Sequence, residues 1–174
     1  MIKGEKVILS QVEEFHLSLL LNWRNNPDFR KYYREYRLLT MTHQKRWWRN
    51  KILNDDSWQY FVIKPIDKDK VIGVTGLTYI HPIYRSAEFA ITIGDLSYSG
   101  QGYGSDALRT LIKYGFNEIN LNRIWCEVFS NNAALEIYKH IGFKAEGIMR
   151  ETYFYDGKYW DSHILSMLRS EWKK

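Results

Sequence analysis

Residues 99–105 have the sequence SGQGYGS, and the interpretation of this 174-residue chain starts there. The stretch lies between a β-rich run at 87–93 and the segment 108–119, whose apolar residues have helical spacing. Alternate glycines let a backbone approach a ligand closely, and a helix start offers free N–H groups and a positive dipole end. The stretch therefore predicts a phosphate cradle, with a plain glycine turn as the structural alternative.

Two common phosphate-binding motifs do not fit this spacing. A dinucleotide fingerprint has Gly-x-Gly-x-x-Gly after the first strand and an acid about 20 residues later. Here Gly100, Gly102 and Gly104 lie in mid-chain, and residues 120–122 are Asn-Leu-Asn. A P-loop needs Gly-Lys followed by Ser or Thr, which the chain lacks. Nicotinamide and P-loop nucleotide sites are therefore disfavoured.

Outward from this stretch, strand and helix patterns alternate along the chain. β-Rich runs predict strands at residues 7–9, 58–63, 71–79, 87–93, 123–129 and 144–149, and a hairpin that joins 153–155 to 159–168. Helical spacing predicts helices at residues 10–25, 42–53, 108–119 and 133–141. The order predicts the α/β class: one domain over residues 1–174, with a mixed, largely antiparallel central sheet flanked by helices.

Local signals set the ends of the first predicted helix. Ser10 followed by Glu13 has the pattern of a capping box, and Pro27 ends the helix that begins there.

The N-terminus has no apolar stretch of signal-peptide length, and no segment approaches the roughly 18 apolar residues of a membrane helix. We expect a cytoplasmic protein with no membrane partner.

Charge and metal-ligand patterns limit the classes of function. The net charge of +5 is too small to indicate a nucleic-acid partner by itself. The single cysteine, Cys126, excludes an internal disulfide, and the five histidines are scattered, so we expect no metal site. The charge is uneven, because residues 23–51 hold nine Lys or Arg but only Asp28 and Glu35 as acids.

The glycine stretch resembles a signature of the GNAT superfamily of N-acetyltransferases, Gln/Arg-x-x-Gly-x-Gly/Ala at the head of the central helix. Ser99, Gly102 and Gly104 take the signature places, with Ser99 replacing the usual Gln or Arg. The resemblance implies a GNAT-like fold and acetyl-coenzyme A as cosubstrate. It also implies that the pyrophosphate is bound by backbone groups of Ser99, Gly100, Gln101, Gly102, Tyr103, Gly104 and Ser105.

A second block, residues 131–143 (NNAALEIYKHIGF), is similar to the family pattern Asn-x-x-Ala-x-x-x-Tyr-x-x-x-Gly-Phe. The resemblance implies that Asn131 contacts the pantetheine arm and that Tyr138 protonates the departing thiolate. A phenol with a pKa near 10 is protonated at pH 7 and can donate to a thiolate whose pKa is about 8.5. From the residues alone, a core tyrosine is the favoured role for Tyr138, and the two motifs in order reverse that preference. The strand residues that match the family's pantetheine-pairing strand are Ile91, Thr92 and Ile93.

Three further segments are similar to the group of ribosomal-protein N-terminal and spermidine acetyltransferases: residues 87–94 (AEFAITIG), 146–151 (EGIMRE) and 156–162 (DGKYWDS). Glu88, which opens its strand, is the candidate acceptor for the proton of the incoming ammonium, directly or through water. A structural carboxylate is the alternative role for Glu88.

The acceptor amine is predicted from charge. The family places the segment after the first strand along the acceptor cleft, and here that segment is the basic region 23–51. Such a wall favours an amine on an anionic small molecule, for example a nucleotide-linked aminosugar, over a polyamine. The alternatives are spermidine or another polyamine, to whose acetyltransferases residues 84–89 (YRSAEF) are similar, and a protein α-amino group. A non-catalytic RNA-binding module and a homodimer are also left open.

Overall fold

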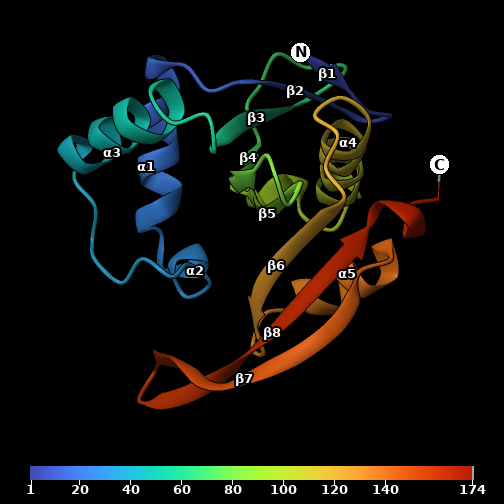
Figure 1. The fold of residues 1–174 in the computed structure, drawn as a ribbon. Coiled ribbons are helices and arrows are strands. Elements are labelled where there is room, and N and C mark those ends of the chain that lie inside the picture. The colour runs from blue at the N-terminus through green and yellow to red at the C-terminus, as the bar shows by residue number, and fades with distance from the viewer. Residues whose placement is uncertain (174) are drawn as a thin grey trace.

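All the strands belong to one eight-stranded sheet in the computed structural model, which describes residues 1–173 (Figure 1). The strand order is β1-β2-β3-β4-β5-β6-β8-β7. The strands are β1 (Ile2–Lys3), β2 (Val7–Gln11), β3 (Gln59–Pro65), β4 (Gly73–His81), β5 (Ser86–Ile93), β6 (Arg123–Phe129), β7 (Lys144–Tyr155) and β8 (Lys158–Leu168). Neighbouring strands are antiparallel except β5 and β6, which are parallel.

Five α-helices lie against this sheet: α1 (Leu17–Asn25), α2 (Pro27–Arg30), α3 (Met41–Trp47), α4 (Tyr103–Asn117) and α5 (Ala134–Ile141). A π-helical segment, Trp48–Leu53, extends α3, and three 3₁₀ turns lie at Glu14–His16, Leu96–Tyr98 and Arg169–Glu171. Figure 1 shows α1, α2 and α3 grouped on one side of strands β2–β5 and α4 on the other.

The two sides of the sheet have separate cores because successive residues of a strand point to opposite faces. Phe61 and Ile63 of β3 face α4 and pack in the larger core with Leu111 and Phe116, which are fully buried. Val62, between them, faces the other way and packs with Leu20 of the first helix. The α4 side and the α1–α3 side are therefore distinct surfaces, separated by the sheet.

The parallel pair β5–β6 is short, and this opens the centre of the sheet. The two strands pair only over Ser86–Glu88 and Arg123–Trp125. Beyond that point β6 keeps β8 as a neighbour through Phe129, whereas β5 continues to Ile93 with β4 as its only strand partner among residues 1–173. The last residues of β5 thus present an open strand edge, which can pair with an extended ligand.

The α/β class and the largely antiparallel sheet flanked by helices are confirmed, but several boundaries were wrong. The first helix begins at Leu17, because Ser10 belongs to β2 and pairs with Val62. Glu13 and His16 form the local cap, in which the backbone N–H of Glu13 donates to His16 Nδ1 at 2.9 Å. Strand β1 was not predicted.

Near the C-terminus the sequence analysis divided one strand into two pieces. Strand β7 runs without a break from Lys144 to Tyr155, with a register irregularity between Met149 and Tyr153. It forms a long hairpin with β8 that extends away from the rest of the sheet (Figure 1). The positive φ of Glu151 (53°) lies within that irregularity and explains why the strand pattern is interrupted there.

Candidate active site

The glycine stretch leads into the first turn of α4. Gly102 is the N-cap with a φ of 85°, and Gly100 has a φ of 72°, both in the left-handed region that favours glycine. The first helical hydrogen bond runs from the N–H of Asp106 to the carbonyl of Gly102, at 3.0 Å. Within residues 1–173, no protein group accepts from the amides of residues 100–105. These free amides at a helix start can bind a phosphate.

Gly104 has a different role from Gly102. A Cβ at Gly104 would lie 3.3 Å from Cγ1 of Ile93, so this glycine lets α4 pack against the end of β5. The backbone of the loop is also reached by Lys6, whose Nζ donates to the carbonyl of Gln101 at 3.1 Å. Lys6 thus places a cation beside the candidate phosphate cradle, and the sequence analysis had not singled it out.

Asp106 ties the start of α4 to the N-terminal strands. Its carboxylate accepts from the backbone amides of Glu5, Lys6 and Val7 at 3.2, 2.8 and 3.0 Å. A carboxylate in the first turn also complements the positive end of the helix dipole. This anchor fixes the cradle relative to the sheet.

The open edge of β5 continues from the loop toward the middle of the sheet. Its last residues are Ile91, Thr92 and Ile93, which the sequence analysis assigned to pantetheine pairing. Asn131, at the other side of the opening, has a buried Oδ1 with no hydrogen-bond partner among the described residues. Buried polar atoms are nearly always paired. An unpaired acceptor is what an amide N–H of the pantetheine arm requires, so these residues fit coenzyme A.

Tyr138 lies on α5, on the same side of the sheet as α4. Its ring packs edge-to-face on Phe89 of β5, with the centroids 5.0 Å apart. Burial raises the pKa of the phenol far above its usual value, and the nearby Cys126 adds to the shift. The hydroxyl therefore keeps its proton at neutral pH, as a general acid must.

Glu88 lies on the opposite side of the sheet and is 5% exposed. Its carboxylate is bound by the guanidinium of Arg34, with Nη1 3.3 Å from Oε2 and Nη2 in contact with Oε1. Arg34 Nε also lies 3.1 Å from Oε2 of Glu127 on β6. The structure thus places Glu88 in an ion-pair network, which agrees with the structural role, and also at the last paired position before the β5–β6 opening.

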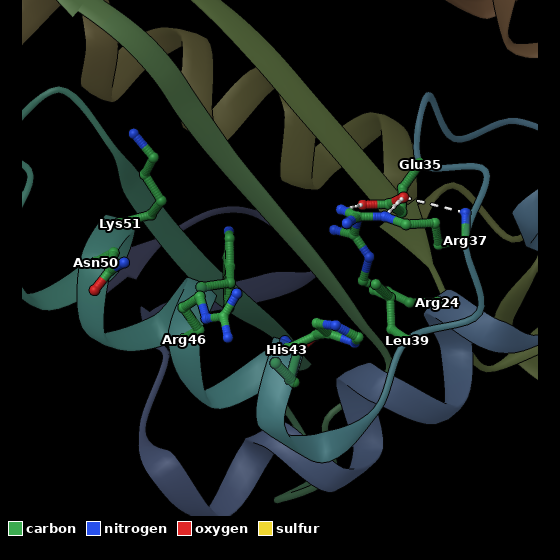
Figure 2. A pocket seen from close by; sticks show the side chains of 10 residues that line it. Arg24, Glu35, Arg37, Leu39, His43, Arg46, Asn50 and Lys51 are labelled. Atoms are coloured by element: carbon green, nitrogen blue, oxygen red, sulfur yellow. Dashed lines mark hydrogen bonds and ion pairs between the residues drawn. The ribbon is translucent and has the colours of Figure 1, made fainter.

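A pocket of about 260 Å³ lies on the same side of the sheet as Glu88, among α1, α3 and the segment between α2 and α3 (Figure 2). Arg24 lines this pocket, and its guanidinium carbon lies 5.3 Å from the centroid of the Tyr33 ring. The Tyr33 hydroxyl donates to Thr92 Oγ1 at 3.0 Å. Two contacts therefore connect the pocket to the open edge of β5.

A family model described as an acetyltransferase (GNAT) domain matches residues 6–144 of the chain. The chain belongs to this family. A spermidine N(1)-acetyltransferase of Vibrio cholerae is 29% identical to the present chain over 170 residues. The alignment covers 97% of the present chain and 96% of the V. cholerae protein. A crystal structure of a V. cholerae spermidine N-acetyltransferase, in complex with coenzyme A and spermine, superimposes with a TM-score of 0.89 at 27% identity and covers 97% and 98% of the two chains.

The family and these relatives make the protein an acetyl-coenzyme A-dependent N-acetyltransferase, as the two motifs predicted. The alternative of a non-catalytic RNA-binding module is set aside. The finer resemblance to ribosomal-protein acetyltransferases has weaker support. A putative ribosomal N-acetyltransferase of Bacillus subtilis is 29% identical over 132 residues and covers only 72% of either chain. The prediction of an aminosugar acceptor finds no support among these relatives, whose names favour its polyamine alternative.

Sequence reasoning expected residues 23–51 along the acceptor cleft, but it missed the partners of Tyr33 and Arg34 on β5. Tyr33 and Thr92 are 59 positions apart, and Arg34 and Glu88 are 54 positions apart. No local spacing signals such contacts.

Within residues 1–173 the structure contains no group of three or more His, Cys, Asp or Glu side chains placed to hold a metal ion. In the same residues, no helix combines the length and hydrophobicity needed to cross a bilayer.

Proposed function

We propose that this acetyltransferase acetylates a primary amine of a small molecule at the opening between β5 and β6. The observation that carries the proposal is the placement of two proton-transfer groups on opposite sides of that opening, Tyr138 on the α5 side and Glu88 on the α1–α3 side. The open edge of β5 lies between them.

The two side chains match the proton balance of acyl transfer. Acetyl-coenzyme A supplies the activated acetyl group. The incoming ammonium first loses one proton and becomes a nucleophilic amine. As the carbon–nitrogen bond forms and the carbon–sulfur bond breaks, the nitrogen loses a second proton and the sulfur gains one, so that one proton in total leaves for the solvent. Tyr138 has its proton at neutral pH and donates it on the thiol side. Glu88 receives the amine proton, directly or through water, while Arg34 holds the carboxylate in position.

For the acceptor, we propose a polyamine first, because spermidine acetyltransferases are the relatives that cover nearly the whole chain. The carboxylates of Glu88 and Glu127 already bind one organic cation, the guanidinium of Arg34, at this place. An ammonium group of a polyamine has the same charge. An amine on an anionic molecule, such as a nucleotide-linked aminosugar, is the second candidate and is favoured by the basic residues of the pocket. A protein α-amino group is the third.

Release of free thiol from acetyl-coenzyme A tests the proposal. The panel is spermidine, spermine, a nucleotide-linked aminosugar and a peptide with a free N-terminus, each at two ionic strengths. We expect turnover with spermidine to exceed turnover with the peptide. Because screening weakens attraction to a basic surface, an anionic acceptor would show a KM that rises with salt. Coenzyme A binding without thiol release for any amine would contradict the proposed function.

We also propose that the chain forms a homo-oligomer. One structure of a V. cholerae spermidine N-acetyltransferase is described as dodecameric (TM-score 0.82, 26% identity, 96% of both chains covered). In the present chain, the β7–β8 hairpin exposes Ile148, Phe154 and Tyr159. Light scattering of the purified protein gives the mass of the assembly, and a monomer would contradict this proposal. The cytoplasmic location stays a prediction.

A further inference from the structure

The pocket beside α1 and α3 has an unusual set of charges. Figure 2 shows Arg24 and Arg37 at one end and Arg46 with Lys51 toward the other, and His43 lies between the two ends. The charged residues that line it are Arg24, Glu35, Arg37, Arg46 and Lys51. Four are permanently cationic at neutral pH, and only Glu35 is acidic.

Two of these cations are already neutralised. Arg37 makes a two-pronged contact with Glu35, with Nε–Oε1 and Nη2–Oε2 distances of 2.8 Å each. Lys51 pairs with Asp55 at 2.9 Å. In the part of the chain that the structure describes, Arg24 and Arg46 form no ion pair. Two guanidinium groups of the pocket, Arg24 and Arg46, are therefore not directly paired with a carboxylate.

Arg24 gives a second, independent indication. Its Nε is buried and has no hydrogen-bond partner among residues 1–173. A guanidinium cannot lose its charge in a protein, and a buried donor without an acceptor is costly. The ring of Tyr33 lies beside the guanidinium but supplies no hydrogen-bond acceptor to Nε. An oxygen atom from outside the chain would satisfy this donor.

We propose that this pocket binds an anionic group of a small molecule, a phosphate or a carboxylate, through Arg24 and Arg46. Guanidinium groups bind such oxyanions with paired hydrogen bonds. The indole of Trp47, which also lines the pocket, offers a flat wall for the organic part of the ligand. A polyamine would meet repulsion here, so this site differs in charge from the carboxylate pair at Glu88 and Glu127.

The ligand has two possible sources. The anionic group belongs either to the acceptor molecule or to a separate effector. The contacts of Arg24 with Tyr33 and of Tyr33 with Thr92 put the pocket next to the open edge of β5. A ligand in the pocket can therefore be the acceptor itself or a separate effector. The proposal concerns binding and holds whichever amine is acetylated, so it does not depend on the proposed acceptor.

Calorimetric titration of pyrophosphate and of succinate into the full chain tests the proposal. Coenzyme A is kept saturating so that the cofactor site is filled. We expect pyrophosphate, succinate or both to bind, with an affinity that falls as salt rises. Arg24→Met and Arg46→Met should each weaken binding at least about tenfold, the size of a lost charge-assisted contact.

Arg49→Met is the matched control. Arg49 is exposed like Arg46 and lies three residues further along the same helical segment, but it does not line the pocket. Because Arg46 is exposed, its substitution leaves the core intact even if Arg24→Met does not fold. No binding of either anion, an equal loss in Arg49→Met, or displacement of pyrophosphate by spermidine would overturn the proposal.

Inhibition kinetics then separate the two sources. If the anionic group belongs to the acceptor, pyrophosphate raises the KM for the amine without changing kcat. If it belongs to an effector, pyrophosphate changes kcat at saturating amine. Either pattern, when lost in Arg46→Met and kept in Arg49→Met, supports the anion site; inhibition that persists in Arg46→Met contradicts it.

Discussion

The two sides of the sheet, proposed to bind the cofactor and the acceptor, differ in which groups form them: mainly backbone groups on the cofactor side and side chains on the acceptor side. On the side proposed to bind the cofactor, backbone amides of residues 100–105, the edge of β5 and one short helix form the candidate site. On the acceptor side, the contacts are made by side chains from distant segments, such as Arg34 with Glu88 and Tyr33 with Thr92. A site made of backbone needs glycines at fixed spacing and is visible in the sequence. A site made of distant side chains is not.

The largest expected effect tests the proposed general acid on the cofactor side. Tyr138→Phe removes the phenolic proton and keeps the ring that packs on Phe89. We expect turnover to fall by about 10² to 10⁴, the range for a positioned general acid, with little change in coenzyme A affinity. Steady-state thiol release and a thermal shift with coenzyme A measure the two quantities. Unchanged turnover, with chemistry rate-limiting, would make Tyr138 a packing residue only.

A second substitution tests the backbone character of the cradle. Gly102 has a φ of 85°, so Gly102→Val strains the loop and places a side chain where the pyrophosphate would approach. Coenzyme A at about a hundred times its Kd stabilises the fold by ~2.7 kcal/mol, and the variant should lose this gain. Gly147→Ala is the control, because its Cβ would meet nothing within 4 Å. Gly104→Val is less informative, since its side chain would press on Ile93.

The acceptor side is tested through the ion pair of Arg34 and Glu88. Arg34→Met leaves a carboxylate that is 5% exposed without this cation, and we expect a loss of about 1–3 kcal/mol of unfolding free energy. Glu88→Gln should cost less stability, because Arg34 keeps Glu127, but should lower turnover at least about tenfold. Urea unfolding and thiol release separate these effects. A Glu88→Gln enzyme with full turnover would leave Glu88 a structural role only.

The smallest expected effect compares two acids whose partners lie at different distances along the chain. Hydrogen bonds from Arg123 (Nη1–Oε1, 2.6 Å) and Ser166 (2.7 Å) lower the pKa of Glu146 to about 2 and join β6, β7 and β8. Its stabilising contribution is therefore complete above the unfolded-state pKa of 4.5 and is lost as the pH falls toward 2. Because the side chain is 40% exposed, solvent screening reduces the contribution to about 1 kcal/mol.

Glu35 has the same lowered pKa of about 2, caused by hydrogen bonds from Arg37, but its partner is only two residues away. A pair so close in sequence also forms in part in the unfolded chain, which reduces its net effect on stability. Between pH 7 and pH 3, the free energy of unfolding should therefore depend less on pH in Glu146→Gln than in Glu35→Gln. Equal slopes of unfolding free energy against pH in the two variants would contradict this reasoning.

The same difference explains what the sequence could predict. The loop of the candidate cradle and the helix of Tyr138 were located because their residues are consecutive, and the alternating strands gave the sheet its class. The start of the first helix was wrong because Ser10, a good cap locally, is held in β2 by its partner Val62 on β3. The charge of residues 23–51 was visible, but its division into paired and unpaired cations depends on contacts such as Lys51 with Asp55. The identity of the acceptor amine could be predicted neither from the local patterns nor from the charge of residues 23–51.

Asp106 links the beginning of the chain to its middle, and this bears on how the protein is made. Val7 and Asp106 are 99 residues apart, and contacts across such a distance form late in folding because closing a long loop costs entropy. At a synthesis rate of about 5–20 residues per second, the first strands wait roughly 5–20 s before their anchor is translated. During that time β1 and β2 can pair with each other and then with β3, but the backbone amides of Glu5, Lys6 and Val7 lack the carboxylate of Asp106. Coenzyme A competence should therefore appear only late on the nascent chain.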